Sequence, residues 1–124
     1  MALLNTNFSV HNLDTLFKNS SKIFFIGIGG ISMSSLAKFC LKENKTVFGY
    51  DKTRTEITEE LEKDCHIKYC SSTDNVYGMD LVIYTTAIDE NCFEYAYAKK
   101  LNIPLVSRAN FLGYIMTKYK KKMT

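Results

Sequence analysis

Apolar, β-rich runs alternate along most of the chain with segments in which apolar side chains recur at helical spacing. Residues 23–28 form a nearly continuous apolar run, which is typical of a parallel strand buried on both faces. Residues 32–41 then follow a helical pattern. We predict strands at residues 23–28, 46–51, 66–70, 80–87 and 103–107, and helices at residues 12–19, 32–41, 53–64, 92–101 and 108–122.

This order of elements predicts an α/β fold. Strands that alternate with helices form a parallel sheet with helices on both faces, because the crossovers between parallel strands are right-handed. We therefore expect a Rossmann-like, mostly parallel five-stranded sheet. The chain shows no internal repeat and no Gly/Ser linker, so a single domain is expected.

Two of the predicted helices carry more detailed expectations. The helix at residues 53–64 is predicted to begin with Thr53 as its N-cap, with Glu56 completing a capping box; Thr55 is the alternative cap. The helix at residues 92–101 is expected to bury one apolar stripe. The members of that stripe are Phe93, Ala96, Tyr97 and Leu101.

Composition and charge narrow the class of protein. The chain has 124 residues, of which 46% are apolar and 23% charged, as expected for a soluble domain with a real core. The net charge of +3 arises mainly from lysines near residue 120, which suit a helix end, so no nucleic-acid partner is predicted.

No run is long enough to span a membrane, and no secretory signal pattern precedes the four cysteines. We expect a cytoplasmic protein with free thiols. The spacing of Cys65, His66 and Cys70 matches no common zinc pattern, so no metal site is predicted.

A glycine-rich turn joins the first predicted strand to the first long helix. The pattern is G-x-G-x-x-S over residues 27–32, in which Ser32 replaces the third glycine of the dinucleotide-binding fingerprint. Glycine lets the backbone approach a ligand closely, and the N–H groups at a helix N-terminus bind anions. We therefore predict that this turn binds a diphosphate. The alternative is a tight turn without a ligand. A valine at Gly29 is expected to abolish binding with only a modest loss of stability.

Two further segments reach the same edge of the predicted sheet. Asp51 ends the second strand, where dinucleotide-binding folds place an acid that contacts ribose hydroxyls; the alternative is a solvated turn residue. Residues 85–91 follow the fourth strand. The chain contains neither a nucleophile elbow nor the ATP-binding pattern G-x-x-x-x-G-K-[ST]. No catalytic residue is predicted, and we expect a domain that binds a nucleotide-containing ligand.

Four motifs in order resemble the N-terminal domain of the Mur ligases. They are the turn at residues 27–34, the strand ending at Asp51, the T-A-I segment within residues 85–88, and the strand and helix start at residues 103–108. The resemblance covers residues 22–116, and within the family it is greatest to the ligases that join L-alanine to UDP-N-acetylmuramate. It implies that residues 22–124 bind the UDP-sugar substrate and that residues 1–21 are an N-terminal extension.

The resemblance also implies roles for particular residues. The implied substrate-binding residues are Gly27, Gly29, Gly30, Ile31, Ser32, Asp51, Thr85, Thr86, Ala87 and Arg108. ATP, magnesium and L-alanine would be bound by a central and a C-terminal domain of the complete ligase, so this chain alone is expected to bind UDP-N-acetylmuramate without ligating it. Relatives often have a glycine–histidine pair where Cys70 and Ser71 stand here, so a contact from that histidine is not transferred.

Three alternatives remain open from the sequence. The chain fits a free-standing Rossmann module that binds NAD(P), a domain of a related Mur-type ligase that adds a whole peptide, or an interaction domain with an aromatic-rich surface. Tyrosine and phenylalanine occur eight times each, but many of them lie in predicted strands and are better explained as core residues.

Overall fold

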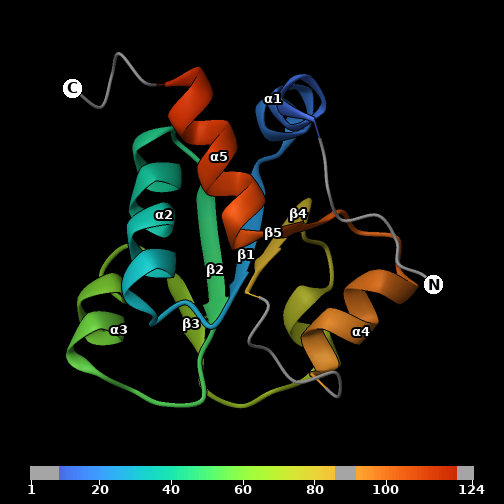
Figure 1. The fold of residues 1–124 in the computed structure, drawn as a ribbon. Helices are drawn as coiled ribbons and strands as arrows, with labels where there is room; N and C mark the ends of the chain where they lie inside the picture. The colour runs from blue at the N-terminus through green and yellow to red at the C-terminus, as the bar shows by residue number, and fades with distance from the viewer. Residues whose placement is uncertain (1–8, 86–91, 120–124) are drawn as a thin grey trace.

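The computed structural model describes residues 9–85 and 92–119, and within them it contains a single five-stranded parallel sheet (Figure 1). The strands are β1 (Lys22–Ile26), β2 (Thr46–Tyr50), β3 (His66–Lys68), β4 (Leu81–Tyr84) and β5 (Leu105–Ser107). The helices are α1 (Val10–Asn19), α2 (Ile31–Lys42), α3 (Glu56–Leu61), α4 (Phe93–Lys100) and α5 (Arg108–Lys118), with a 3₁₀ turn, η1 (Thr73–Val76). The predicted α/β fold with a parallel sheet is confirmed.

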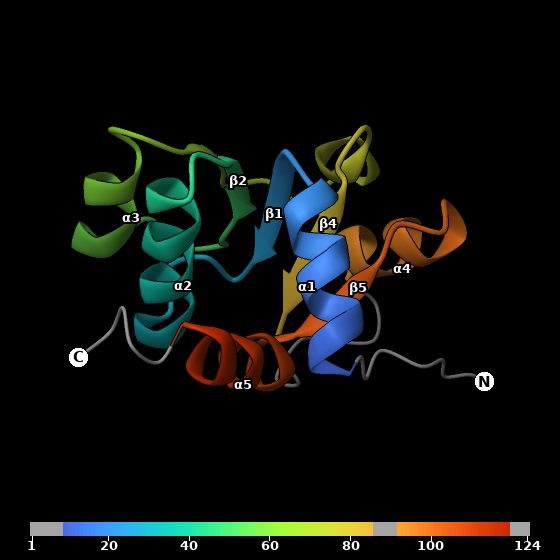
Figure 2. The same cartoon turned by 90° about the horizontal axis from the view of Figure 1, so that it is seen from above.

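The sheet separates two hydrophobic layers, because successive side chains of a strand point to opposite faces. In β1, Ile23 and Phe25 belong to the larger cluster, whereas Phe24 and Ile26 belong to the smaller one. Helices α1, α2 and α5 supply most of the helical side of the larger cluster, and α4 and η1 cover the other face (Figure 2). The continuous apolar run in β1 follows from this double burial.

The strand order is β3-β2-β1-β4-β5, so the chain changes direction across the sheet at β1. The register pairs Ile26 with Tyr50 on one side of β1 and Phe25 with Ile83 on the other. Since every pairing is parallel, all carboxyl ends lie at one edge of the sheet, toward the bottom of Figure 1. In open α/β sheets, ligands bind outside this edge, at the point where the strand order reverses.

The start of α3 differs from the prediction. Thr55, not Thr53, is the N-cap: its hydroxyl accepts from Thr58 N at 3.3 Å, while the Thr58 hydroxyl accepts from Thr55 N at 2.8 Å. A buried threonine therefore takes the part that a glutamate plays in the usual capping box. Thr53 N donates to Asp51 Oδ1 at 3.1 Å, which holds the preceding residues in a turn.

The expected apolar stripe of α4 is wrong. Phe93 and Leu101 are 56% and 38% exposed, whereas Glu94 and Ala98 are completely buried. Glu94 and Ala98 are four residues apart and share one helix face, which is the face turned to the sheet. The burial of Glu94 is possible because other segments donate hydrogen bonds to its carboxylate, a feature that hydrophobic spacing does not reveal.

The first helix is part of the main core. Leu13 and Phe17 of α1 are buried in the larger cluster beside residues of α5. The Lys45 ammonium donates to Phe17 O and Ser20 O, both at 2.7 Å, and lies 4.5 Å from the centre of the Phe17 ring. Lys45 thereby binds the carbonyl groups at the C-terminal end of α1, where the helix dipole favours a cation.

Candidate functional site

The glycine turn begins where β1 ends. Gly27 has φ +83°, a conformation that residues with a Cβ rarely adopt, and this positive φ ends the strand at Ile26. The N–H groups of Gly27 and Ile28 donate to Tyr50 O at 2.7 and 3.1 Å, and Gly30 N donates to Gly27 O at 3.2 Å. These bonds hold the turn against the end of β2.

The N-terminus of α2 lies at the end of this turn. Gly30 is the N-cap and provides no side-chain hydrogen bond to the helix. The first-turn N–H groups, those of Ile31, Ser32 and Met33, have no acceptor within the helix, because the intrahelical pattern begins with Ser34 N donating to Gly30 O. Together with the helix dipole, these groups favour an anion. The Ile31 side chain is 80% exposed and leaves this end of the helix open to solvent.

Asp51 faces the turn from the end of β2. Its Oδ2 accepts from Gly29 N at 2.8 Å, and its Oδ1 accepts from Thr53 N. Gly29 is close-packed: a Cβ at this position would lie 2.8 Å from Asp51 Oδ2 and 2.8 Å from Thr58 Cγ2. The structure therefore brings Asp51 and Gly29 together as predicted, but it directs both Asp51 oxygens at backbone N–H groups.

Arg108 reaches the turn from the other side. It is the first residue of α5, and its Nη1 donates to Ser32 Oγ at 3.3 Å, although the two residues are 76 positions apart. The Arg108 side chain is half-buried. A guanidinium thus lies at the same helix end as the uncapped N–H groups of α2, which adds a formal positive charge to the dipole of that helix.

The segment after β4 reaches the same edge. Thr85 follows β4 directly, and β4 pairs with β1 through Ile83 and Phe25, so Thr85 lies at the same edge of the sheet as the glycine turn. Thr86 and Ala87, the other two predicted residues of this segment, are outside the described residues.

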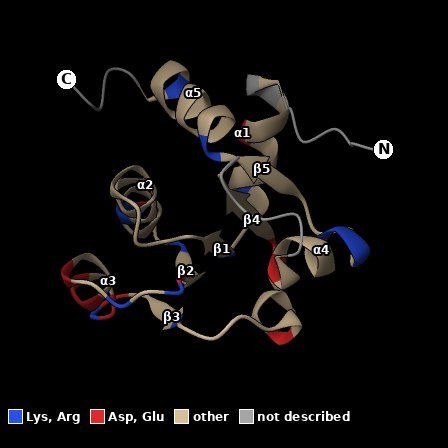
Figure 3. Cartoon of the chain, turned by 60° about the horizontal axis from the view of Figure 1, so that its bottom comes forward, with Lys and Arg blue, Asp and Glu red and all other residues tan. Residues whose placement is uncertain are grey.

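Both signs of charge occur around this edge. Acidic residues gather on α3, and α5 begins with a basic residue (Figure 3). The first turn of α3 carries Glu56 and Glu59, and Glu59 is ion-paired with Arg54 at 3.4 Å. The start of α5 therefore attracts an anion at the turn, whereas the negative charge of α3 is partly neutralised within the protein.

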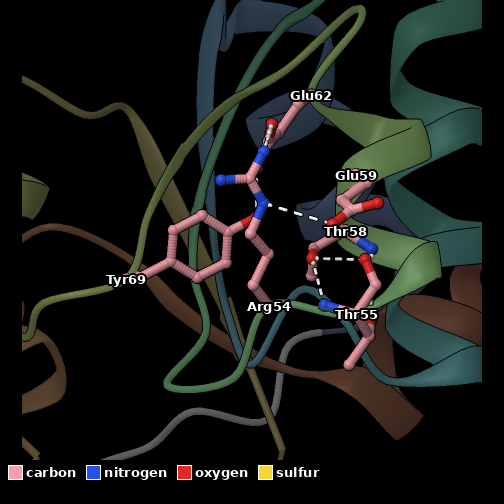
Figure 4. A network of polar contacts seen from close by, with 6 residues as sticks. All are labelled: Arg54, Thr55, Thr58, Glu59, Glu62 and Tyr69. Atoms are coloured by element: carbon pink, nitrogen blue, oxygen red, sulfur yellow. Dashed lines mark hydrogen bonds and ion pairs between the residues drawn. The ribbon is translucent and has the colours of Figure 1, made fainter.

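A polar network that the sequence did not predict holds the loop after Asp51. Arg54 forms ion pairs with Glu59 at 3.4 Å and Glu62 at 3.0 Å, and its guanidinium lies 5.8 Å from the Tyr69 ring centre (Figure 4). The Tyr69 hydroxyl donates to Glu62, and burial together with this bond raises the pKa of Tyr69. The network joins the loop after β2 to the end of β3, beside the candidate site.

A second unpredicted cluster surrounds Glu94. Its carboxylate accepts from Ser71 Oγ at 2.7 Å, Ser72 N at 2.8 Å and Asn75 Nδ2 at 2.6 Å, and Cys92 Sγ lies 3.5 Å away. These bonds fasten the loop after β3 to the start of α4. Hydrophobic spacing carries no signal for this cluster, because its members are polar and Ser71, Ser72 and Asn75 are 19 to 23 residues from Glu94 in the sequence.

The arrangement offers donors to an anion. The donors are the first-turn N–H groups of α2 and the Arg108 guanidinium, because the N–H groups of residues 27–30 already donate to acceptors within the protein. Within residues 9–85 and 92–119, no group of three or more His, Cys, Asp or Glu side chains is placed to hold a metal ion. None of the helices in that part of the chain combines the length and apolar character of a membrane span. A groove of about 690 Å³ over β2 and β3 includes none of the predicted site residues.

Comparison with known proteins agrees with this architecture. The model of the family described as "Mur ligase family, catalytic domain" matches residues 22–120. The chain is 48% identical over 100 residues to a UDP-N-acetylmuramate–L-alanine ligase of Caldanaerobacter subterraneus subsp. tengcongensis, covering 80% of this chain and 22% of the relative. It is 45% identical over 105 residues to the enzyme of that name from Agathobacter rectalis, covering 83% and 23%.

A solved structure extends the likeness to three dimensions. The UDP-N-acetylmuramate-alanine ligase MurC of Thermotoga maritima matches with a TM-score of 0.71 and 36% identity, over 81% of this chain and 23% of that one. The chain thus spans less than a quarter of the length of these relatives. From the extent of the family match and these identities, the chain belongs to the Mur ligase family.

Proposed function

We propose that this chain is the UDP-N-acetylmuramate-binding domain of an ATP-dependent UDP-N-acetylmuramate–L-alanine ligase of peptidoglycan synthesis, acting in the cytoplasm. Residues 22–124 form this domain in the proposal, and residues 1–21 precede it. The chain binds the substrate and does not ligate it. The related peptide-adding ligases, which the family resemblance leaves open, are the second candidate.

The observation that carries the proposal is the convergence of donors at one helix end. The glycine turn, the uncapped start of α2 and Arg108 meet at the strand edge where the sheet order reverses. A diphosphate needs several N–H donors and a positive charge, which the first-turn N–H groups of α2 and Arg108 supply. In the proposal, Gly27, Gly29, Gly30, Ile31, Ser32 and Arg108 surround the diphosphate, Asp51 lies near the nucleoside, and Thr85, Thr86 and Ala87 form the opposite wall.

ATP and magnesium do not fit the described residues. Within the described residues no three or more His, Cys, Asp or Glu side chains come together in a group that could hold a metal ion, and the sequence has no ATP-binding glycine–lysine loop. In the proposal, ATP, magnesium and L-alanine are bound by other parts of the complete ligase. No step of the ligation is assigned to the residues of this chain.

The test is a titration of the ¹⁵N-labelled chain with UDP-N-acetylmuramate, with NADH as the comparison ligand. We expect the amide signals of residues 27–34 to shift with the first ligand and not with the second. At a ligand concentration of 100 times Kd, binding adds about 2.7 kcal/mol to the free energy of unfolding, which a thermal melt detects. A response to NADH alone would favour the Rossmann cofactor module instead, and no response of these amides at millimolar UDP-N-acetylmuramate would refute the proposal.

A further inference from the structure

We propose that the Asp51 carboxylate serves as a built-in anion of the glycine turn. In the free protein it accepts a hydrogen bond from Gly29 N, and this N–H binds the diphosphate instead when the ligand is present. This inference rests on the proposed function, because it concerns the turn that is assigned there to the diphosphate. It replaces the simpler expectation that the Asp51 carboxylate contacts only the nucleoside.

The contacts of Asp51 are the basis of the inference. Its Oδ2 is 2.8 Å from Gly29 N, and its Oδ1 is 3.1 Å from Thr53 N, so each oxygen accepts one backbone N–H. Hydrogen bonds to a carboxylate are stronger than those between neutral groups. The N–H that the glycine pattern offers to a phosphate is therefore already bound to a negative charge from the protein itself.

The side chains around Gly29 differ in their freedom to move. Thr58 is completely buried, and its hydroxyl takes part in the capping box of α3. Asp51 is half-buried, and the residues that follow it, Lys52 to Thr55, are exposed. A ligand that needs space or an N–H at Gly29 can therefore obtain it by turning the Asp51 side chain outward, without unpacking Thr58.

Electrostatics decide which anion is favoured at the turn. A diphosphate on the N–H groups of Ile31 and Ser32 would lie close to both Arg108 and the start of α2, which attract it. The Asp51 carboxylate carries the same sign of charge as the phosphate and opposes it. Neutralising Asp51 while keeping its shape should therefore strengthen diphosphate binding, whereas the loss of a ribose contact would weaken nucleotide binding.

The experiment compares the wild-type chain, Asp51→Asn and Asp64→Asn by isothermal titration with inorganic pyrophosphate, UDP, uridine and UDP-N-acetylmuramate. Asp64 is exposed and follows α3, so its replacement changes the net charge equally without touching the turn. We expect Asp51→Asn to bind pyrophosphate and UDP about threefold more tightly, the effect of removing a like charge at roughly 6 Å in water. Uridine binding and the Asp64→Asn variant should be unchanged. The Gly29 amide signal should shift in ligand-free Asp51→Asn.

The outcomes separate the inference from the proposed function. If the wild-type chain binds UDP-N-acetylmuramate but Asp51→Asn binds pyrophosphate no more tightly, the inference fails and the proposed function stands. If UDP binding weakens while pyrophosphate binding is unchanged, Asp51 is a ribose ligand and the inference is again overturned. If the wild-type chain binds none of these ligands, both ideas fail. Should Asp51→Asn not fold, Asp51→Ser, which keeps a short neutral acceptor, takes its place in the same titrations.

Discussion

Replacement of Gly29 by alanine tests how the glycine turn is packed. The added methyl group would lie 2.8 Å from both Asp51 Oδ2 and Thr58 Cγ2, closer than real Cβ atoms approach other atoms. Backbone conformation is not the cause, because Gly29 is not among the glycines with positive φ. The expected loss of stability therefore arises from steric overlap, and either the turn or its neighbours must shift.

The size of the effect follows from these two contacts. Overpacking against the buried Thr58 costs about 1–3 kcal/mol, and displacement of Asp51 loses a hydrogen bond worth about 1 kcal/mol at a half-exposed site. We expect Gly29→Ala to lower the free energy of unfolding by about 3 kcal/mol. With an m-value of about 2 kcal/mol/M, the urea midpoint falls by about 1.5 M. Valine would cost more, so the modest loss expected from the sequence is too small.

Gly113→Ala is the matched control for this measurement. Gly113 lies on the exposed face of α5, and a Cβ there would have no atom within 4 Å. Since alanine is the better helix former, this variant should gain about 0.8 kcal/mol. The double variant Gly29→Ala with Asp51→Ala should recover the part of the loss that is due to Asp51. A loss below about 1 kcal/mol for Gly29→Ala would show that the turn is not packed as described.

Three further changes probe other parts of the molecule. Arg108→Ala should weaken UDP-N-acetylmuramate binding about tenfold in isothermal titration, because a charge-assisted contact contributes about 1.4 kcal/mol or more. Backbone hydrogen bonds from Lys22 and Ser21 lower the pKa of Asp80 below its ordinary 3.8, so this carboxylate stabilises the fold above that pH and loses its effect as pH falls through the lowered value. Asp80→Asn should therefore cost about 1 kcal/mol in urea unfolding at pH 7 and much less at pH 3. Glu94→Ala should cost about 3 kcal/mol in the same assay, because it leaves buried donors without an acceptor.

Each of these expectations has a result that contradicts it. Unchanged affinity in Arg108→Ala would show that the guanidinium does not contact the ligand; Lys100→Ala, at an exposed residue at the end of α4, is the control for lost charge. An equal cost of Asp80→Asn at both pH values would mean that the charge of the carboxylate is irrelevant. A Glu94→Ala variant as stable as the wild type would show that water replaces the carboxylate in the cluster.

Hydrophobic spacing predicted the elements that bury apolar faces and missed those held by polar contacts. β1, β2 and α2 follow from the apolar runs, since their side chains fill the two clusters. The buried face of α4 does not, because it includes a carboxylate that becomes tolerable only when a distant loop donates to it. Pairings of this kind depend on tertiary contacts and have no periodic signature.

The candidate site, too, was predictable from the sequence only in part. The glycine turn and the start of α2 were predictable because positive φ and an uncapped helix have local sequence signatures. The meeting of Arg108 with Ser32 was implied only by family resemblance, since nothing local links residues so far apart. The hydrogen bond from Gly29 N to Asp51 was not predicted. The positions of strand ends predict which residues lie near one another, but not which donor binds each carboxylate oxygen.

The position of α1 determines where a shortened form of this protein can begin. The match to the family model begins at residue 22, yet Leu13 and Phe17 are interior residues and Lys45 binds carbonyl groups on both sides of the α1 C-terminus. The border of the family model is therefore not the border of the folded unit. A truncation that begins at residue 22 would expose the apolar surface of Phe111 and Tyr114, so the smallest autonomous piece must retain the helix that precedes the family model.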